Sequence, residues 1–211
     1  MTVDELIEEG RRIARRTILL TPEGSGTPAA IWYGHDHGEE SADGHRCWLS
    51  VDARFVPSCA LRGWLSIFTD DESCEGGRVD VSSPPLNSSG VRLYPKEIEV
   101  LPPIDAVIAR GSPAVDRWLE ENEWQRDWLY NSNFRGRAIV EKYEAVWQRE
   151  HPLYWKEAYA TLGGWHMGWP DDDWHELLDE KLLVQTYMES EPWVEAWQLR
   201  SGELKVIQRI T

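Results

Sequence analysis

The chain has 211 residues, of which 41% are hydrophobic and 28% charged, the balance of a folded globular protein. Its 37 acids and 22 bases give a formal net charge of −15, which argues against a nucleic-acid or anionic-membrane partner, because phosphate contacts need clustered Lys and Arg. Neither an apolar export signal nor a run of about 18 apolar residues occurs. We therefore expect one compact cytoplasmic unit over residues 1–211, in which residues 1–100 (β-rich) and 101–211 (helical plus a C-terminal sheet) could form lobes.

The N-terminus has the features of an amphipathic helix. Thr2-Val3-Asp4-Glu5 has the form of a capping box, in which a threonine side chain and a glutamate three residues later satisfy the first backbone N–H groups. Apolar residues then recur at helical spacing at Leu6, Ile7, Ile13 and Ala14. The pattern predicts a helix over residues 2–16, with Gly10 on the apolar stripe as a point of close packing.

Short apolar runs separated by turn residues follow this helix. They predict strands at 17–21, 29–33, 46–51 and 61–68. The connections, 34–44, 70–77 and 82–90, are rich in Gly, Asp and Ser, which join antiparallel strands more readily than they open crossover helices. The first hundred residues should therefore form an antiparallel meander.

Two helices are predicted in the central section. Ser112-Pro113 is an N-cap followed by proline at the first helical position, which predicts a helix over residues 113–122. A second apolar repeat begins at Ile139 and should end at His151-Pro152, because proline disfavours the helical conformation of the residue before it.

Strand patterns return at residues 182–187, 193–199 and 204–210, predicting a three-stranded C-terminal meander. Alternation places Trp193, Glu195 and Trp197 on one face of the middle strand, with Val194 and Ala196 on the other. The predicted fold class is α+β: a mostly antiparallel sheet with an N-terminal helix, a central helical section and this C-terminal meander.

Acidic and aromatic residues are concentrated between residues 165 and 195. This stretch carries nine acids against one base, a formal charge of −8, whereas the other 180 residues carry −7. Rigid indoles rimmed by carboxylates can anchor and steer a basic protein. The predicted partner-binding residues are Trp165, His166, Trp169, Asp171, Asp172, Asp173, Trp174, His175, Glu191, Trp193 and Glu195. The alternative is a short helix that begins at Pro170, with aspartates in its first turn and indoles packed inside.

Three places in the sequence contain side chains that can bind a metal. His166 and His175 are nine residues apart with a proline between them, unlike ligands presented three or four apart on a helix. His35 and His37, with His45 or Cys47, could complete a four-ligand set, but three glycines punctuate this segment as in a solvated loop. The acidic turn 70–77 lacks the ligand order of a calcium loop. We therefore expect no metal and no other cofactor.

Motifs for nucleophilic catalysis and phosphate binding are missing from the sequence. It contains no Gly-x-Ser-x-Gly elbow, no phosphate loop and no dinucleotide fingerprint. Cys47, Cys59 and Cys74 are an odd number at spacings that fit neither a disulfide framework nor a zinc knuckle. They are expected to be free thiols.

A small, acidic, tryptophan-rich chain without catalytic motifs is similar in composition to many bacterial immunity or inhibitor proteins that neutralise a basic toxin. We therefore expect an acidic cytoplasmic binding protein that masks a basic protein partner. The alternative is a hydrolase that uses His166 or His175 with a nearby carboxylate, with or without a metal. Gene neighbours would discriminate the two, and the oligomeric state stays open.

Overall fold

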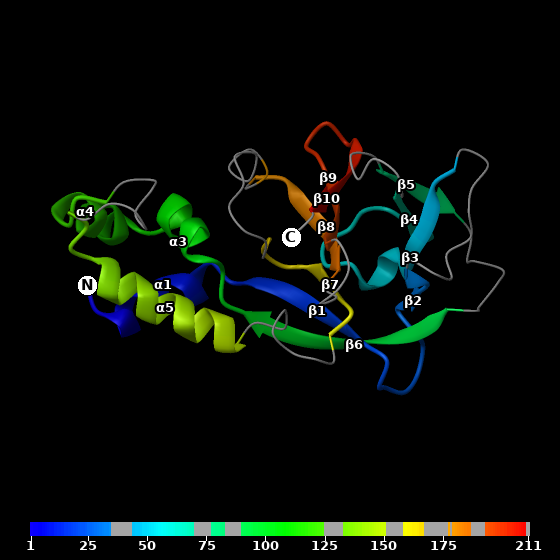
Figure 1. Ribbon diagram of the computed structural model, residues 1–211, viewed down its shortest axis with the longest axis horizontal. Coiled ribbons are helices and arrows are strands. Elements are labelled where there is room, and N and C mark those ends of the chain that lie inside the picture. The colour runs from blue at the N-terminus through cyan, green and yellow to red at the C-terminus, as the bar shows by residue number, and fades with distance from the viewer. Residues whose placement is uncertain are drawn as a thin grey trace. The chain divides into compact units, whose positions relative to one another are not determined.

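The structure, a computed structural model, has the predicted α+β class (Figure 1). The residues that it describes are 1–34, 44–69, 77–82, 90–124, 133–150, 158–166, 177, 179–186 and 193–209. They belong to two compact units. The helical unit comprises residues 1–15, 99–154 and 165–168, and the β unit comprises residues 16–98, 155–164 and 169–211. One unit over residues 1–211 stays a prediction.

Within the described residues, four helices of the helical unit pack around one apolar cluster. They are α1 (Val3–Arg12), α3 (Ile104–Arg110), α4 (Pro113–Glu121) and α5 (Arg137–Glu150). The cluster contains Leu6 of α1, Val107 of α3, Trp118 of α4 and Tyr143 of α5, all buried. The apolar repeats that predicted α1 and α5 therefore supply the packing faces of these two helices. Helix α3 was not predicted, because its seven residues are too short for a clear helical repeat.

Helix α1 begins at the predicted capping box. The Thr2 hydroxyl accepts a hydrogen bond from the Glu5 N–H, and the Glu5 carboxylate accepts one from the Thr2 N–H. The helix ends at Arg12, so the predicted end at residue 16 is wrong. Arg15 already belongs to the first strand, whose backbone hydrogen bonds replace those that a longer helix would make.

A ten-stranded sheet makes up the β unit (Figure 1). Its strands are β1 (Arg15–Thr21), β2 (Ala30–Trp32), β3 (Arg46–Asp52), β4 (Trp64–Thr69), β5 (Gly77–Ser82), β6 (Val91–Val100), β7 (Ala160–Gly163), β8 (Lys181–Thr186), β9 (Trp193–Gln198) and β10 (Leu204–Arg209). The order is β10-β9-β8-β7-β1-β6-β2-β3-β4-β5, and every resolved pairing is antiparallel. Two meanders, β2 to β5 and β7 to β10, thus flank the pair β1 and β6.

The predicted C-terminal meander is present as β8, β9 and β10, but it continues the same sheet as the N-terminal strands. The prediction also omitted β5, β6 and β7. Strand β6 contains Arg92, Lys96 and Glu97 with Pro95 among them, a composition that argues against a strand when read alone. Strand β7 has only four residues.

The sheet curls until it is nearly closed. Its two outer strands, β5 and β10, lie side by side, and a Cβ added to Gly77 of β5 would lie 2.6 Å from a methyl carbon of Val206 in β10. One apolar cluster fills the interior with buried residues from nine of the ten strands, and the partly buried Val79 of β5 packs against it. The cluster includes Trp32 and Trp48, whose rings meet edge to face. The core of the β unit is therefore the inside of this curled sheet.

No helix in the described part of the chain is long and apolar enough to cross a membrane.

Candidate partner-binding surface

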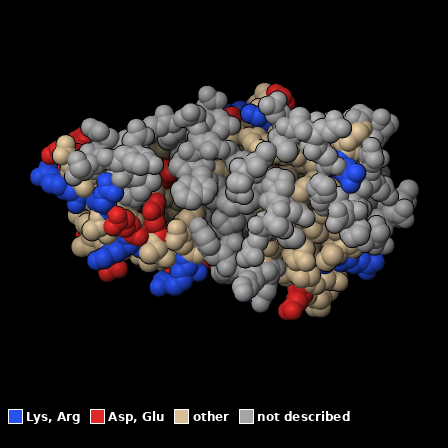
Figure 2. Space-filling view, viewed as in Figure 1, with Lys and Arg blue, Asp and Glu red and all other residues tan. Residues whose placement is uncertain are grey.

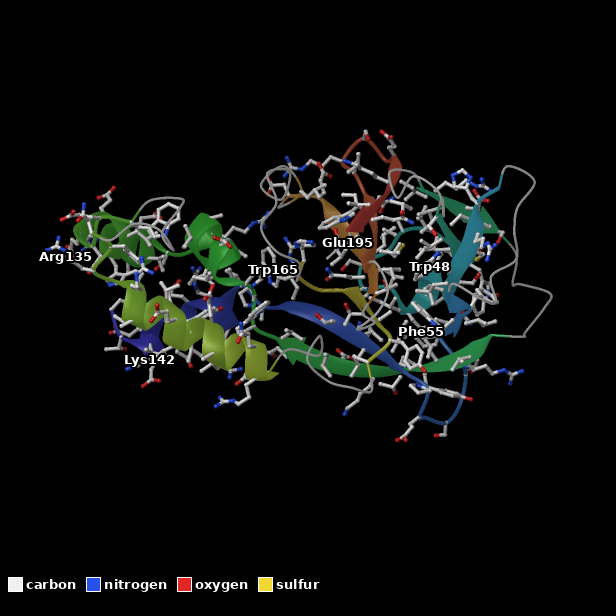
Figure 3. All side chains as sticks on the ribbon, in the orientation of Figure 1. Trp48, Phe55, Arg135, Lys142, Trp165 and Glu195 are labelled. Carbon is white, nitrogen blue, oxygen red and sulfur yellow. The ribbon has the colours of Figure 1, made fainter. Side chains whose placement is uncertain are left out.

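Trp165, the first predicted partner-binding residue, is buried in the helical unit with 5% of its surface exposed (Figure 3). Its indole N–H donates a hydrogen bond to the backbone carbonyl of Ile13 at 3.1 Å. The guanidinium carbon of Arg15 lies 3.7 Å from the indole centroid, and that of Arg110 lies 5.4 Å away. These are cation–π distances, so the ring already holds two cations of its own chain.

His166 follows in the same unit and is only 4% exposed. Of the residues named for a hydrolytic site around 166–176, it is the one that lies within the described residues. Its burial removes it from solvent, and the hydrolase hypothesis stays a prediction.

Glu195 lies in strand β9 of the β unit and is 0% exposed (Figure 3). Its carboxylate accepts hydrogen bonds from the Gln185 side-chain amide and from the Trp197 indole N–H, each at 3.1 Å. Val194 and Ala196 share one face of the strand, as alternation predicts, and this face lines the interior of the curled sheet. Glu195 therefore faces outward, yet it is buried, so both faces of β9 are covered at this position.

The other predicted partner-binding residues are not placed in detail. Trp193 begins strand β9, but its side chain is not described. Trp169, Asp171, Asp172, Asp173, Trp174, His175 and Glu191 lie outside the described residues. The structure does not bring the three described side chains together in one unit, since Trp165 and His166 belong to the helical unit and Glu195 to the β unit.

Several strands of the first meander start or finish at one end of the β unit. Strand β4 finishes at Thr69, which pairs with Arg46 at the start of β3 and with Gly77 at the start of β5. Strand β2 finishes at Trp32, which pairs with Leu49 of β3. The chain segments that connect β2 to β3 and β4 to β5 therefore both leave and return at this end.

The second meander contributes one more connection to the same end. Because neighbours alternate in direction across ten strands, β10 runs opposite to β5, and its last residues lie beyond Gly77. Gln208 near the end of β10 pairs with Val194 of β9, whose N–H donates to the hydroxyl of Thr186 at the end of β8. The segment between β8 and β9 thus also leaves and returns here.

These three connections carry most of the net charge of the protein. Residues 35–43 and 70–76 have four acids each, residues 187–192 have two, and none of the three contains Lys or Arg, which gives a formal charge of −10. We call the end of the β unit marked by Trp32, Arg46, Thr69, Gly77, Thr186 and Trp193 the acidic end. Asp171 to Asp173 belong instead to the connection from β7 to β8, which leaves from the opposite end.

The strands themselves are not acidic. The described residues of the β unit contain eleven Lys and Arg against eight Asp and Glu, and the whole described part of the chain carries a formal charge of −1. In the helical unit, basic and acidic side chains are interleaved over the surface (Figure 2). The acidity predicted from composition thus resides in the connections and not in the framework.

The other candidate clusters are only partly described. Cys47 is buried on the outer face of β3, with its sulfur 3.7 Å from the hydroxyl of Ser50, and His35 and His37 lie outside the described residues. Within the ranges that the structure describes, no three His, Cys, Asp or Glu side chains are grouped to hold a metal. Cys47 and Cys59 are free thiols as predicted, and Cys74 is not described.

Sequence reasoning missed the polar side chains that the sheet brings together. Gln185 and Glu195 are ten residues apart and meet only because β8 pairs with β9. Ser50 and Ser66 meet at 2.9 Å through the pairing of β3 with β4. No local spacing signals such pairs, because strand register decides them.

No protein-family model matches this sequence, and no curated protein or solved structure is significantly similar to it.

Proposed function

We propose that this chain is an acidic cytoplasmic binding protein whose acidic end masks a basic protein partner, in the manner of an immunity or inhibitor protein. The observation that carries the proposal is the convergence of three connections with a formal charge of −10 on one end of the β unit. Negative charge gathered within a region a few Debye lengths wide attracts a basic surface and raises its association rate.

The contrast between framework and connections supports the same function. Gathering like charges at one end costs self-repulsion, and loops fold with many other compositions. The described residues of the β unit carry an excess of three bases, so the negative charge is not a general property of this unit. Binding of a basic partner explains why the connections are acidic, whereas folding does not require acidic residues there.

The role of the aromatic residues changes in this proposal. Trp165 and Glu195 are held by hydrogen bonds inside their units and act as framework. The partner-facing part of the predicted set is Glu191, which belongs to the acidic connection 187–192. Contact by Trp169, Trp174 and the aspartates between them stays a prediction.

A pair of charge variants of equal size tests the proposal. The first replaces the four acids of one acidic connection by their amides: Asp36→Asn, Glu39→Gln, Glu40→Gln and Asp43→Asn. The control replaces four exposed acids of the helical unit: Asp4→Asn, Glu8→Gln, Asp116→Asn and Glu120→Gln. Each variant changes the formal net charge from −15 to −11. Any difference between them therefore reports where the charge lies.

The wild-type chain is cross-linked in the cells that produce it, captured partners are identified by mass spectrometry, and a purified partner is then mixed with each variant in a stopped-flow instrument. We expect a basic partner whose association rate falls about tenfold with the first variant at low salt, and much less with the control. Equal rates for wild type and first variant, or a partner without a basic surface, would refute the proposal.

A further inference from the structure

Two large hydrophobic side chains are exposed among the described residues of the protein. They are Val91 at the start of β6, with 42% of its surface exposed, and Val81 near the end of β5, with 47% exposed. Both belong to the β unit. Single exposed apolar residues are common on protein surfaces and need no explanation by themselves. The position of each valine in the sheet and the charges around it decide whether it has a role in binding.

Strand register places both valines on the inner face of the curled sheet. Val91 pairs with Trp32 of β2, a buried member of the interior cluster. Val81 pairs with Leu65 of β4, another buried member of that cluster. Residues that pair directly across two strands share a face, and Leu93, two residues after Val91, is fully buried in the same cluster. The two valines therefore lie where the inner face of the sheet reaches solvent.

Val91 belongs to the acidic end of the β unit, because its pairing partner Trp32 is the last residue of β2. The acidic connection 35–43, with four acids and no Lys or Arg, begins three residues after Trp32. The segment that leads into β6, residues 83–90, contains no charged residue at all. Val91 is thus an exposed apolar side chain at the end of the sheet where the negative charge is gathered.

Val81 has a different charge environment. It is followed by Ser82, the last residue of β5, whose carbonyl oxygen would lie 2.7 Å from a Cβ added to Gly63. Gly63 closes the connection from β3 to β4, in which the charged residues are Arg54 and Arg62. The two exposed valines are therefore alike in residue type, exposure and face of the sheet. One borders a connection with four acids, and the other borders a connection without any.

A stable protein interface combines charge with apolar contact. Attraction between opposite charges raises the association rate, whereas apolar contacts from which water is excluded slow dissociation. Interfaces accordingly have a centre depleted of charge and a polar rim. At the acidic end, Val91 supplies an exposed apolar side chain and the acidic connections supply the charge. At the opposite end, Val81 lacks such neighbours in the connection that it borders.

We infer that Val91 is an apolar contact residue of the acidic end, and that the basic partner presents an apolar side chain among its Lys and Arg residues. The inference rests on the proposed function and specifies the chemistry of the partner. Charge complementarity favours a basic partner over a second copy of this chain, because two acidic ends with a formal charge of −10 each repel one another.

Two basic peptides of equal charge test the inference. Both have three lysines on each side of a central pair, which is Leu-Leu in one peptide and Ser-Ser in the other, and both carry the same dye. Binding to the purified chain is followed by fluorescence anisotropy at low and at high salt. At low salt we expect both peptides to bind and the leucine peptide to bind about fivefold more tightly, because its leucines cover Val91 while its lysines face the acidic connections.

Val91→Asp and Val81→Asp form a matched pair of variants. Each replaces an exposed valine of the same face and changes the formal net charge from −15 to −16. In Val91→Asp the leucine peptide should lose its fivefold advantage, whereas the serine peptide should bind at least as tightly as to the wild type, because the added charge attracts it. Val81→Asp should keep the advantage. Val91→Thr, which keeps the shape of the side chain, should reduce the advantage if Val91→Asp does not fold.

The outcomes separate this inference from the proposed function. If neither peptide binds, or if high salt does not weaken binding, the acidic end does not attract a basic surface, and the proposed function fails together with the inference. If both peptides bind the wild type equally, the inference alone is overturned. It is also overturned if Val91→Asp keeps the preference for leucine, or if Val81→Asp removes this preference as well.

Discussion

Both units have ion pairs at the surface, such as Arg200 with Asp179 in the β unit, but they differ in the polar side chains that they bury. In the helical unit, ion pairs lie at the surface, as for Arg12 with Glu9 and Arg135 with Glu123. In the β unit, a carboxylate and an amide, Glu195 and Gln185, are 0% exposed and bond to each other. Exposed ion pairs contribute only about 0.2–1 kcal/mol each, whereas losing one partner of a buried polar pair leaves the other unsatisfied and costs several-fold more. A substitution at the buried pair of the β unit should therefore cost more stability than one at a surface ion pair of the helical unit.

The largest effect is expected at Glu195. Glu195→Ala leaves the Gln185 amide and the Trp197 indole N–H buried without their acceptor, so we expect the free energy of unfolding to fall by about 3 kcal/mol. Glu195→Gln keeps one acceptor oxygen and should lose less. Urea denaturation gives the free energies, and hydrogen exchange of β8 and β9 peptides locates the loss. If Glu195→Ala lowers the free energy of unfolding no more than the exposed control Glu5→Gln does, the expected difference between buried and surface polar groups is wrong.

The sequence predicted the helices better than it predicted the sheet. Helical signals are local: the capping box at Thr2 and the Ser112-Pro113 start depend on residues within one turn, and both are confirmed. Strands β1 to β4 were found because their apolar runs fill the interior. Strand β6 and the closure of β5 against β10 depend on partners far away in the chain, which local patterns do not contain.

The candidate site shows the same limit. Composition predicted an acidic surface in the stretch between residues 165 and 195, which includes Asp171 to Asp173. The topology groups three other acidic connections at the opposite end of the β unit. The burial of Glu195 could not be predicted either, because alternation in a strand separates two faces without saying whether both are covered.

The second effect tests packing in the helical unit. Gly10 was predicted as a point of close approach, and a Cβ there would lie 2.5 Å from the hydroxyl oxygen of Tyr143, which itself donates to the Pro102 carbonyl at 2.8 Å. Gly10→Ala should therefore lower the free energy of unfolding by about 2 kcal/mol, even though alanine favours a helix. Urea denaturation measures the loss.

A double-mutant cycle identifies the clash. In a Tyr143→Phe background the hydroxyl is gone, and the nearest ring carbons lie 3.3 Å from the added Cβ. The same Gly10→Ala change should then cost little or even stabilise the helix by up to about 1 kcal/mol. An equal loss in both backgrounds would mean that Gly10 matters for a reason other than Tyr143.

The smallest effect concerns a carboxylate of the helical unit that is neither exposed nor paired as Glu195 is. Burial, together with the nearby charges of Asp105 and Glu141, raises the pKa of Glu144 from 4.5 to about 7. Because the folded-state pKa exceeds the unfolded one, the neutral form contributes stability that is fully present below pH 4.5 and is lost as the pH rises through about 7.

Glu144→Gln should therefore leave stability almost unchanged at about pH 4.5 and raise it at about pH 8, by at most about 1 kcal/mol because solvent reaches part of the side chain. Urea denaturation at both pH values checks this, with the exposed Glu120→Gln as control. If Glu144→Gln changes the free energy of unfolding equally at the two pH values, ionisation of Glu144 does not destabilise the helical unit. Sensitivity to a buried carboxylate would then distinguish the β unit from the helical unit.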